Sequence, residues 1–124
     1  MNALLIVAHG SRRQASNEEI QQLTHMISQH EDYEFDAVAC GFLELAEPSI
    51  GDAITQLADA NAETITVVPY FLACGTHVAD DIPEEIDKAK TAHPGITITL
   101  KDYLGSSTSM PSLLLELAKG DVTH

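Results

Sequence analysis

Two histidines occupy comparable positions in this sequence, each shortly after an apolar run. His9 directly follows ALLIVA at residues 3–8, and His77 follows TITVVPYFL at residues 64–72. Neutral imidazole is a good ligand for divalent ions such as Co²⁺, Ni²⁺ and Fe²⁺. A lone loop histidine more commonly satisfies a local hydrogen bond, so a metal site requires the two to meet in one cleft. Spacing alone leaves open both a shared cleft and two independent loop roles.

A carboxylate lies between the two histidines in the chain. Glu44 belongs to FLELAEPSI at residues 42–50 and can serve as a metal ligand, a proton acceptor or an orienter of a histidine. Glu47 is typical of a helix start. Cys74 precedes His77 by three residues, and we expect a small buried thiol there rather than a ligand. We expect surface or capping roles for the other histidines: His25, His30, His93 and His124.

Four apolar, β-rich runs predict the elements that must position these groups. They cover residues 3–8, 35–41, 64–72 and 96–100. The first and third are almost continuously apolar, which is typical of central parallel strands covered on both faces.

Helical spacing separates the four runs. Apolar residues recur every three or four positions around Ile20–Ile27, Ile50–Ala58, Ile82–Ala89 and 111–119. Ser109 is expected to cap the last helix, with Pro111 in its first turn, and Pro48 and Pro83 are expected to open the second and third.

The order βαβαβαβα predicts one α/β domain with a parallel sheet and helices on both faces. Ligands of such sheets bind at the carboxyl ends of the strands. That rule selects the loops at residues 9–14, 41–47, 73–81 and 102–110, and the first three contain the candidate groups.

Composition excludes several classes of partner. The net charge is −13 with only six Lys and Arg among 124 residues, which argues against nucleic acid and anionic membrane surfaces. No apolar run approaches the length of a membrane span. The two cysteines form no CxxC pair, which favours a reducing cytoplasm. Neither GxGxxG nor GxxxxGK occurs, so we expect no nucleotide.

Three stretches together resemble a known family, the class II tetrapyrrole chelatases, and within it the small sirohydrochlorin cobaltochelatases of cobalamin biosynthesis. They are LIVAHGSR at residues 5–12, FLELAEPSI at 42–50 and VPYFLACGTHVADDIP at 68–83. The resemblance implies a flavodoxin-like three-layer sandwich with a four-stranded parallel sheet, as a single chelatase domain over residues 1–124. It also implies a homodimer, because larger relatives resemble two such domains in one chain.

The resemblance further implies that His9 and His77 bind the metal, which is a substrate, with no nucleotide required. The reaction would be insertion of Co²⁺, Ni²⁺ or Fe²⁺ into sirohydrochlorin, with Glu44 as partner of the histidines. Gly10, Ser11, Arg12 and Thr76 are the residues expected to contact the substrate's carboxylates. The match weakens from Lys101 onward, and the loop at 106–109 has no assigned role.

Two other functions use the same residues. A module that only binds or delivers metal would need the same histidines and no catalysis. A histidine phosphatase fits poorly, because Ala8 precedes His9 where that class has arginine and because the chain has few arginines to surround a phosphate.

Overall fold

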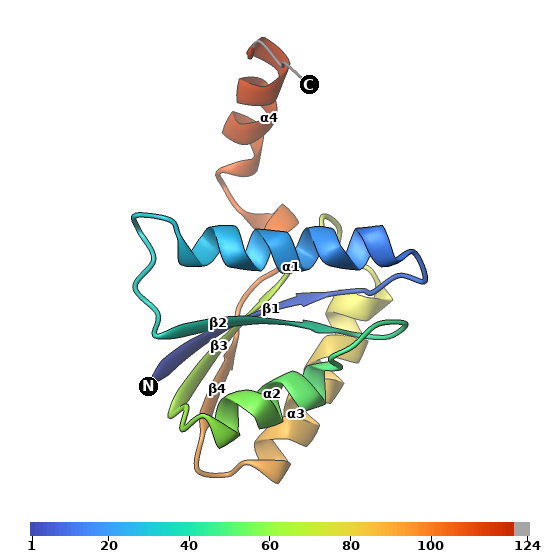
Figure 1. Cartoon of the computed structure of the whole chain (residues 1–124). Helices are drawn as coiled ribbons and strands as arrows, with labels where there is room; N and C mark the ends of the chain where they lie inside the picture. Colours follow the sequence, from blue (N-terminus) through green and yellow to red (C-terminus); the bar gives the residue numbers. More distant parts are fainter. Residues whose placement is uncertain (121–124) are drawn as a thin grey trace.

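The four predicted strands form one parallel sheet in the computed structural model, which describes residues 1–120 (Figure 1). The strands are β1 (Asn2–Ala8), β2 (Ala37–Phe42), β3 (Thr64–Pro69) and β4 (Thr97–Leu100). Their order in the sheet is β2-β1-β3-β4, and every pairing is parallel. The predicted α/β class and four-stranded parallel sheet are thereby confirmed.

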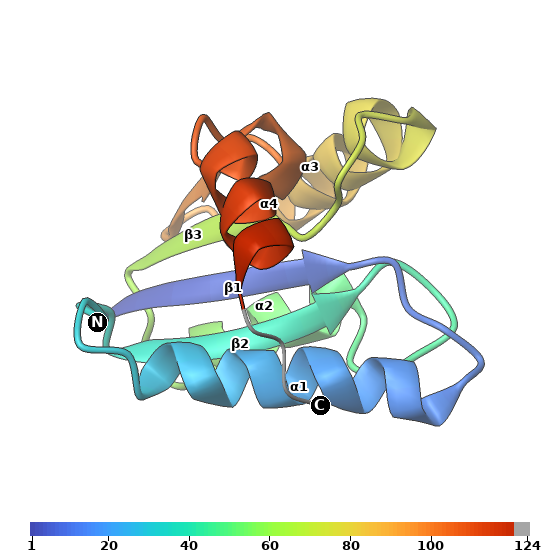
Figure 2. The ribbon, with the colours of Figure 1, turned by 90° about the horizontal axis from the view of Figure 1, so that it is seen from above.

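Helices connect the strands and lie on both faces of the sheet. They are α1 (Gln14–Ser28), α2 (Ile50–Asp59), the π-helical turn η1 (His77–Asp81), α3 (Ile82–Ala92), the 3₁₀ turn η2 (Leu104–Ser106) and α4 (Met110–Lys119). Figures 1 and 2 show α1 on one face and α2 and α3 on the other. The sheet with its covering helices is the scaffold that carries the loops selected above.

The main core lies between the sheet and the pair α2 and α3. Alternate residues of the strands point into it, and the largest fully buried side chains there include Leu5, Ile54, Ile65 and Ile86. Ser49 caps α2, since its Oγ accepts a hydrogen bond from the amide of Asp52. These contacts fix the strand ends from which the candidate residues project.

The predicted coverage of β3 on both faces is wrong. Burial alternates along β3, with Ile65, Val67 and Pro69 buried and the intervening residues only half-buried. By contrast, residues 3–8 of β1 are buried throughout. The reason is that α1 packs against β2, whereas α4, the other helix on that face within residues 1–120, projects away from β3 and β4 (Figures 1 and 2).

Helix starts also differ from the predictions in two places. Ser109 occupies the N-cap position of α4 but makes no side-chain cap bond. Pro48 precedes the capping residue Ser49 rather than standing in the first turn of α2. Pro83 and Pro111 do lie in the first turns of α3 and α4, where a missing amide hydrogen costs no helical hydrogen bond.

Two further expectations concern membrane-spanning helices and the last residue of the sequence. Within residues 1–120, none of the helices combines the length and apolar character needed to cross a membrane. His124, which was expected at the surface, lies outside the described residues.

Replacing Ile54 by alanine tests the core. The side chain is fully buried between α2 and the sheet, so Ile54→Ala should lower the free energy of unfolding by about 2–5 kcal/mol. Gln56→Ala is the matched control because Gln56 is exposed on the same helix. Urea denaturation measures both. Equal stability of the two variants would show that this packing is not the main core.

Candidate metal centre

The candidate residues gather at the carboxyl edge of the sheet because β1 pairs with both β2 and β3. The last paired residue of β1 toward β2 is Ala8, opposite Phe42, and toward β3 it is Val7, opposite Pro69. All three strands therefore end at the same edge. The rings of His9 and His77 lie there with their centroids 4.7 Å apart and an interplanar angle of 65°.

His9 makes a specific contact through each ring nitrogen. Nδ1 lies 2.8 Å from the carbonyl oxygen of Gly10, and Nε2 lies 2.9 Å from Oε1 of Glu44. Because a carbonyl oxygen only accepts hydrogen bonds, Nδ1 must carry a proton. In the neutral ring, Nε2 is then left with a lone pair that faces a carboxylate oxygen.

The short contact of Nε2 with Glu44 suits a shared proton or a metal ion. A lone pair and a carboxylate oxygen at 2.9 Å repel each other unless a proton or a metal ion lies between them. His9 and Glu44 are thus arranged so that both can bind one divalent ion.

Backbone hydrogen bonds hold Glu44 beside His9. The amide of Glu44 donates to the carbonyl of His9 at 3.0 Å, and the amide of Leu43 donates to the carbonyl of Ala8 at 2.9 Å. Gly10 has φ +94°, and a Cβ there would lie 1.8 Å from the carbonyl oxygen of Glu44. Only glycine permits this approach, so the two loops pack directly against each other.

His77 is oriented by a residue whose role the sequence did not reveal. Its Nδ1 lies 2.8 Å from Oδ2 of Asp81, four residues later. A carboxylate at a helix start ordinarily has a capping role, and Asp81 does precede Ile82 at the start of α3, but its side chain makes no cap bond. The spacing of four residues on one helical face is the signal that could have found it.

The Asp81 contact fixes which nitrogen of His77 is free to bind an ion. A carboxylate only accepts, so it holds the proton on Nδ1 and leaves Nε2 with its lone pair. At most histidine metal ligands in proteins, the other ring nitrogen donates to a carboxylate, a backbone carbonyl or water, and Asp81 supplies the first of these. His9 and His77 therefore share the same tautomer.

The potential ligand atoms of the three side chains lie slightly farther apart than they would around one bound ion. Among residues 1–120, His9, Glu44 and His77 form the group of potential ligands, with one ligand atom from each lying within 4.8 Å of the others. Ligand atoms about 2.1 Å from one ion at a tetrahedral angle lie about 3.4 Å apart. Because the three side chains are 38–54% exposed, small rotations can close that difference.

Of the four residues predicted to contact substrate, two line a hollow beside His9 and two are exposed. A hollow of about 260 Å³ beside His9 is lined in part by Gly10, Ser11 and Tyr70. The amide of Ser11 is already bonded to Oδ1 of Asn17 at 2.9 Å, so it is not available to an anion, whereas the Ser11 hydroxyl proton remains available. Arg12 and Thr76 are exposed.

The cysteines lie outside the group of potential ligands. Cys74 is exposed, and its predicted burial is wrong because the loop that carries it runs over the surface. Cys40 is half-buried in β2, and burial raises the pKa of its thiol, which keeps it protonated and a poor ligand at neutral pH.

The other described histidines occupy surface or helix-end positions. His25 lies in the last turn of α1, and His93 ends α3. His30 accepts a hydrogen bond from the amide of Asp32. Their predicted roles are confirmed.

Curated proteins of similar sequence are chelatases. The chain is 32% identical over 116 residues to the sirohydrochlorin cobaltochelatase of Sulfurisphaera tokodaii, covering 94% of this chain and 90% of that protein. It is 32% identical to the chloroplastic sirohydrochlorin ferrochelatase of Arabidopsis thaliana, covering 99% of this chain and 52% of that protein. The chain thus spans nearly all of one relative and about half of the other.

Solved structures of similar fold point the same way. A CbiX protein of cobalamin biosynthesis from Marinobacter aquaeolei VT8 superposes with a TM-score of 0.81 at 28% identity, covering 96% of this chain and 95% of that one. The sirohydrochlorin chelatase SirB from Bacillus subtilis subspecies spizizenii, in complex with cobalt, gives 0.74 at 33% identity, covering 80% of this chain and 42% of that one. The CbiX family itself matches residues 3–120, and the chain therefore belongs to the CbiX family.

Proposed function

We propose that this chain inserts a divalent metal ion into sirohydrochlorin, with Co²⁺ as the first candidate and Fe²⁺ and Ni²⁺ as alternatives on the same macrocycle. It does so as a single chelatase domain over residues 1–124 and without a nucleotide. The observation that carries the proposal is the convergence of His9, Glu44 and His77 at one solvent-accessible edge. The names of the curated relatives support the reaction and the macrocycle.

The three side chains supply the chemistry that insertion requires. Two pyrrole N–H protons leave the macrocycle as one M²⁺ enters. His9 and His77 hold the ion through Nε2, and its charge favours deprotonation of the nitrogens that face it. Glu44, within 2.9 Å of His9, accepts one proton as the ion leaves, and a histidine freed by the transfer accepts the other.

The exposure of the site suits release of the ion. A closed site with four protein ligands holds a metal permanently, whereas a site that keeps open positions retains exchangeable water. Here three half-exposed side chains leave one side of the ion open to the approaching macrocycle. The ion is therefore a transferable substrate rather than a structural component.

Local contacts must overcome long-range repulsion, because the chain carries a charge of −13 and the macrocycle carries carboxylates. The hollow of about 260 Å³ beside His9 is smaller than the roughly 300–1,000 Å³ of a typical ligand pocket, so it takes only one edge of the ring. We assign carboxylate contacts to the amide of Gly10 and the hydroxyl of Ser11 in this hollow, and to the hydroxyl of Thr76 and Arg12 outside it. Exposed Leu45 and Leu72 follow Glu44 and β3 and offer apolar contact to the rest of the ring.

We also propose that the protein is a cytoplasmic homodimer. The chain covers 42% of the cobalt-bound SirB chain, and a second copy can supply the other half. Two free cysteines within the described residues fit a reducing cytoplasm.

Removing either histidine tests the proposed reaction. Under anaerobic conditions, sirohydrochlorin mixed with Co²⁺ should gain metal, seen in its visible spectrum, faster with the protein than without it. His9→Ala and His77→Ala should each lower that rate by about 100-fold or more, because each removes a ligand whose loss exceeds that of an orienting partner. His93→Ala is the control, since His93 lies at the distant end of α3. Full metal binding with no acceleration by the wild type would instead indicate a delivery module.

Asp81 should strengthen Co²⁺ binding by orienting His77 rather than by its own negative charge. Asp81→Ala should weaken Co²⁺ binding by about 10–100-fold, whereas Asp81→Asn should retain more affinity because its amide oxygen still accepts the Nδ1 proton. Asp80→Ala removes the same charge one residue away and serves as the control. Calorimetric titration with Co²⁺ gives the affinities. Equal losses for Asp80→Ala and Asp81→Ala would contradict the orienting role.

Gly10 should be required for the position of Glu44. In Gly10→Ala the added Cβ collides with the Glu44 carbonyl at a positive φ, so we expect a loss of about 1–3 kcal/mol in stability together with weaker Co²⁺ binding. Gly51→Ala is the control, because a Cβ there meets nothing within 4 Å. Thermal melts and Co²⁺ titration measure both effects. Identical behaviour of the two variants would argue against loop packing as the determinant.

A further inference from the structure

Asn17, near the start of α1, is a buried polar residue that the proposed reaction does not use. It is 5% exposed, and within residues 1–120 only Thr24 is a comparably buried polar residue. Both polar atoms of its side chain bind the backbone of Ser11. Oδ1 accepts from the Ser11 amide at 2.9 Å, and Nδ2 donates to the Ser11 carbonyl at 2.8 Å. Asn17 therefore holds Ser11 through the same two groups that a neighbouring β-strand would use.

The peptide group between Gly10 and Ser11 connects Asn17 to His9. Its carbonyl, from Gly10, accepts from Nδ1 of His9 at 2.8 Å, and its amide, from Ser11, donates to Asn17. A trans peptide is planar, so its C=O and N–H point in opposite directions and turn together. By holding the amide, Asn17 fixes the direction of the carbonyl that keeps the proton of His9 on Nδ1.

Rotation of this peptide would reverse the tautomer of His9. The Ser11 amide would then face Nδ1, and the proton of the neutral ring would move to Nε2. There it would donate to Oε1 of Glu44, which lies 2.9 Å from Nε2. A hydrogen bond to a carboxylate is roughly twice as strong as one between neutral groups, so a freely rotating peptide would favour this tautomer. Gly10 offers little resistance because it lacks a Cβ, and the resistance must come from Asn17.

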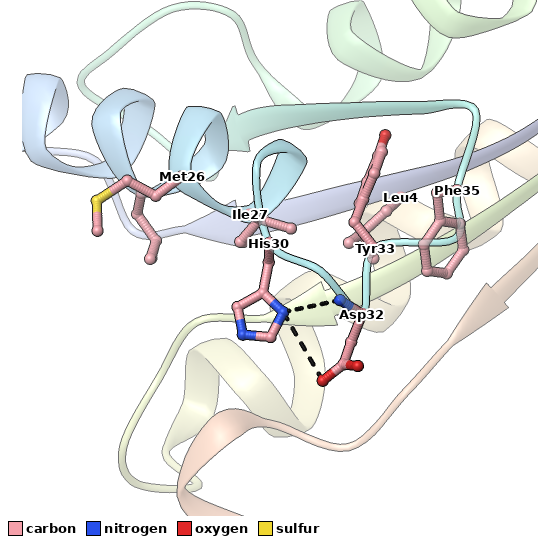
Figure 3. A pocket seen from close by; sticks show the side chains of 8 residues that line it. Leu4, Met26, Ile27, His30, Asp32, Tyr33 and Phe35 are labelled. Atoms are coloured by element: carbon pink, nitrogen blue, oxygen red, sulfur yellow. Dashed lines mark hydrogen bonds and ion pairs between the residues drawn. The ribbon is translucent and has the colours of Figure 1, made fainter.

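The same chain contains the reversed arrangement at His30. There Nδ1 accepts a hydrogen bond at 3.0 Å from the amide of Asp32, two residues later (Figure 3). Ser11 likewise follows His9 by two residues, and its amide is the one that Asn17 binds. A histidine can thus accept from the amide two residues later, and Asn17 removes this option at His9 by accepting that hydrogen itself.

We propose that Asn17 is a positioning residue that fixes the tautomer of His9, so that Nε2 keeps its lone pair for the substrate ion. The inference rests on His9 as a metal ligand in the function proposed above. Asn17 acts through the Gly10–Ser11 peptide and does not touch the ion. Its contribution is needed because Glu44, placed to share the ion, also attracts the ring proton to Nε2 in the metal-free protein.

NMR of the imidazole nitrogens tests this role without metal, because protonated and unprotonated ring nitrogens give separate ¹⁵N signals. In alkaline buffer, where imidazole is neutral, wild-type His9 should carry its proton on Nδ1. His30 should carry its proton on Nε2 and is the internal reference for the reversed form. In Asn17→Ala, the His9 signals should change to the pattern of His30, and His9→Ala and His30→Ala identify the signals. A wild-type His9 protonated on Nε2 would overturn the proposal, as would an unchanged pattern in Asn17→Ala.

Calorimetric titration with Co²⁺ measures the consequence for metal binding. Removing the hydrogen-bond partner of a ligand costs about 10–100-fold in affinity. We expect about 10-fold for Asn17→Ala, because Asn17 acts one hydrogen bond farther from the ion. Thr24→Val is the matched control, since it also removes a buried polar group of α1, whose hydroxyl donates to the carbonyl of Ile20 at 2.8 Å. It should keep the wild-type affinity, and an equal loss in both variants would contradict a specific role for Asn17.

A second variant separates the two hydrogen bonds of Asn17. Asn17→Asp keeps an oxygen for the Ser11 amide and loses the donor to the Ser11 carbonyl, so it should keep the proton of His9 on Nδ1. The pattern of His30 in this variant would show that the bond to the amide does not fix the tautomer.

Cobalt insertion into sirohydrochlorin, assayed on the same samples, reports separately on the proposed function. A wild type with the expected ring signals and Co²⁺ affinity, but without faster insertion, would refute the reaction and leave the role of Asn17 intact.

Discussion

The parallel pairing of β1 with β2 on one side and β3 on the other is the constraint on which the site depends. It brings three strand ends to one edge and sets the residues after them side by side. His9 and His77 are 68 positions apart in the sequence, yet their rings come within 4.7 Å. No local motif could produce this proximity. The buried core under β1 and β3 is therefore also the support of the metal centre.

At that edge, hydrogen bonding decides what the histidines can do. The carbonyl of Gly10 and the carboxylate of Asp81 each accept a hydrogen bond from Nδ1 of a histidine, so both imidazoles keep Nε2 for a cation. Glu44 is then held by backbone bonds against one of those nitrogens. In a chain of charge −13, a divalent ion at this point would relieve local repulsion and favour approach of an acidic macrocycle. The proposed reaction would link metal binding to substrate binding in this way.

Features that follow from local pattern could be read from the sequence, and features that depend on packing could not. The apolar runs predicted all four strands, and their loops predicted where His9, Glu44 and His77 lie. Asp81 escaped notice because a carboxylate at a helix start has an ordinary explanation in capping. The open half of the sheet and the projecting α4 depend on where the chain turns after β4, which hydrophobic spacing does not encode. Cys74 was misplaced because its burial depends on the path of a loop.

The central claim is that His9 and His77 bind one ion through Nε2. Anomalous diffraction at the cobalt absorption edge, from a crystal soaked in Co²⁺, tests it most directly. The account predicts one strong peak about 2.1 Å from Nε2 of both histidines, the bond length known for imidazole on zinc, with Glu44 as the adjacent carboxylate. A peak at Cys74 or among other carboxylates, with none between the two histidines, would contradict it.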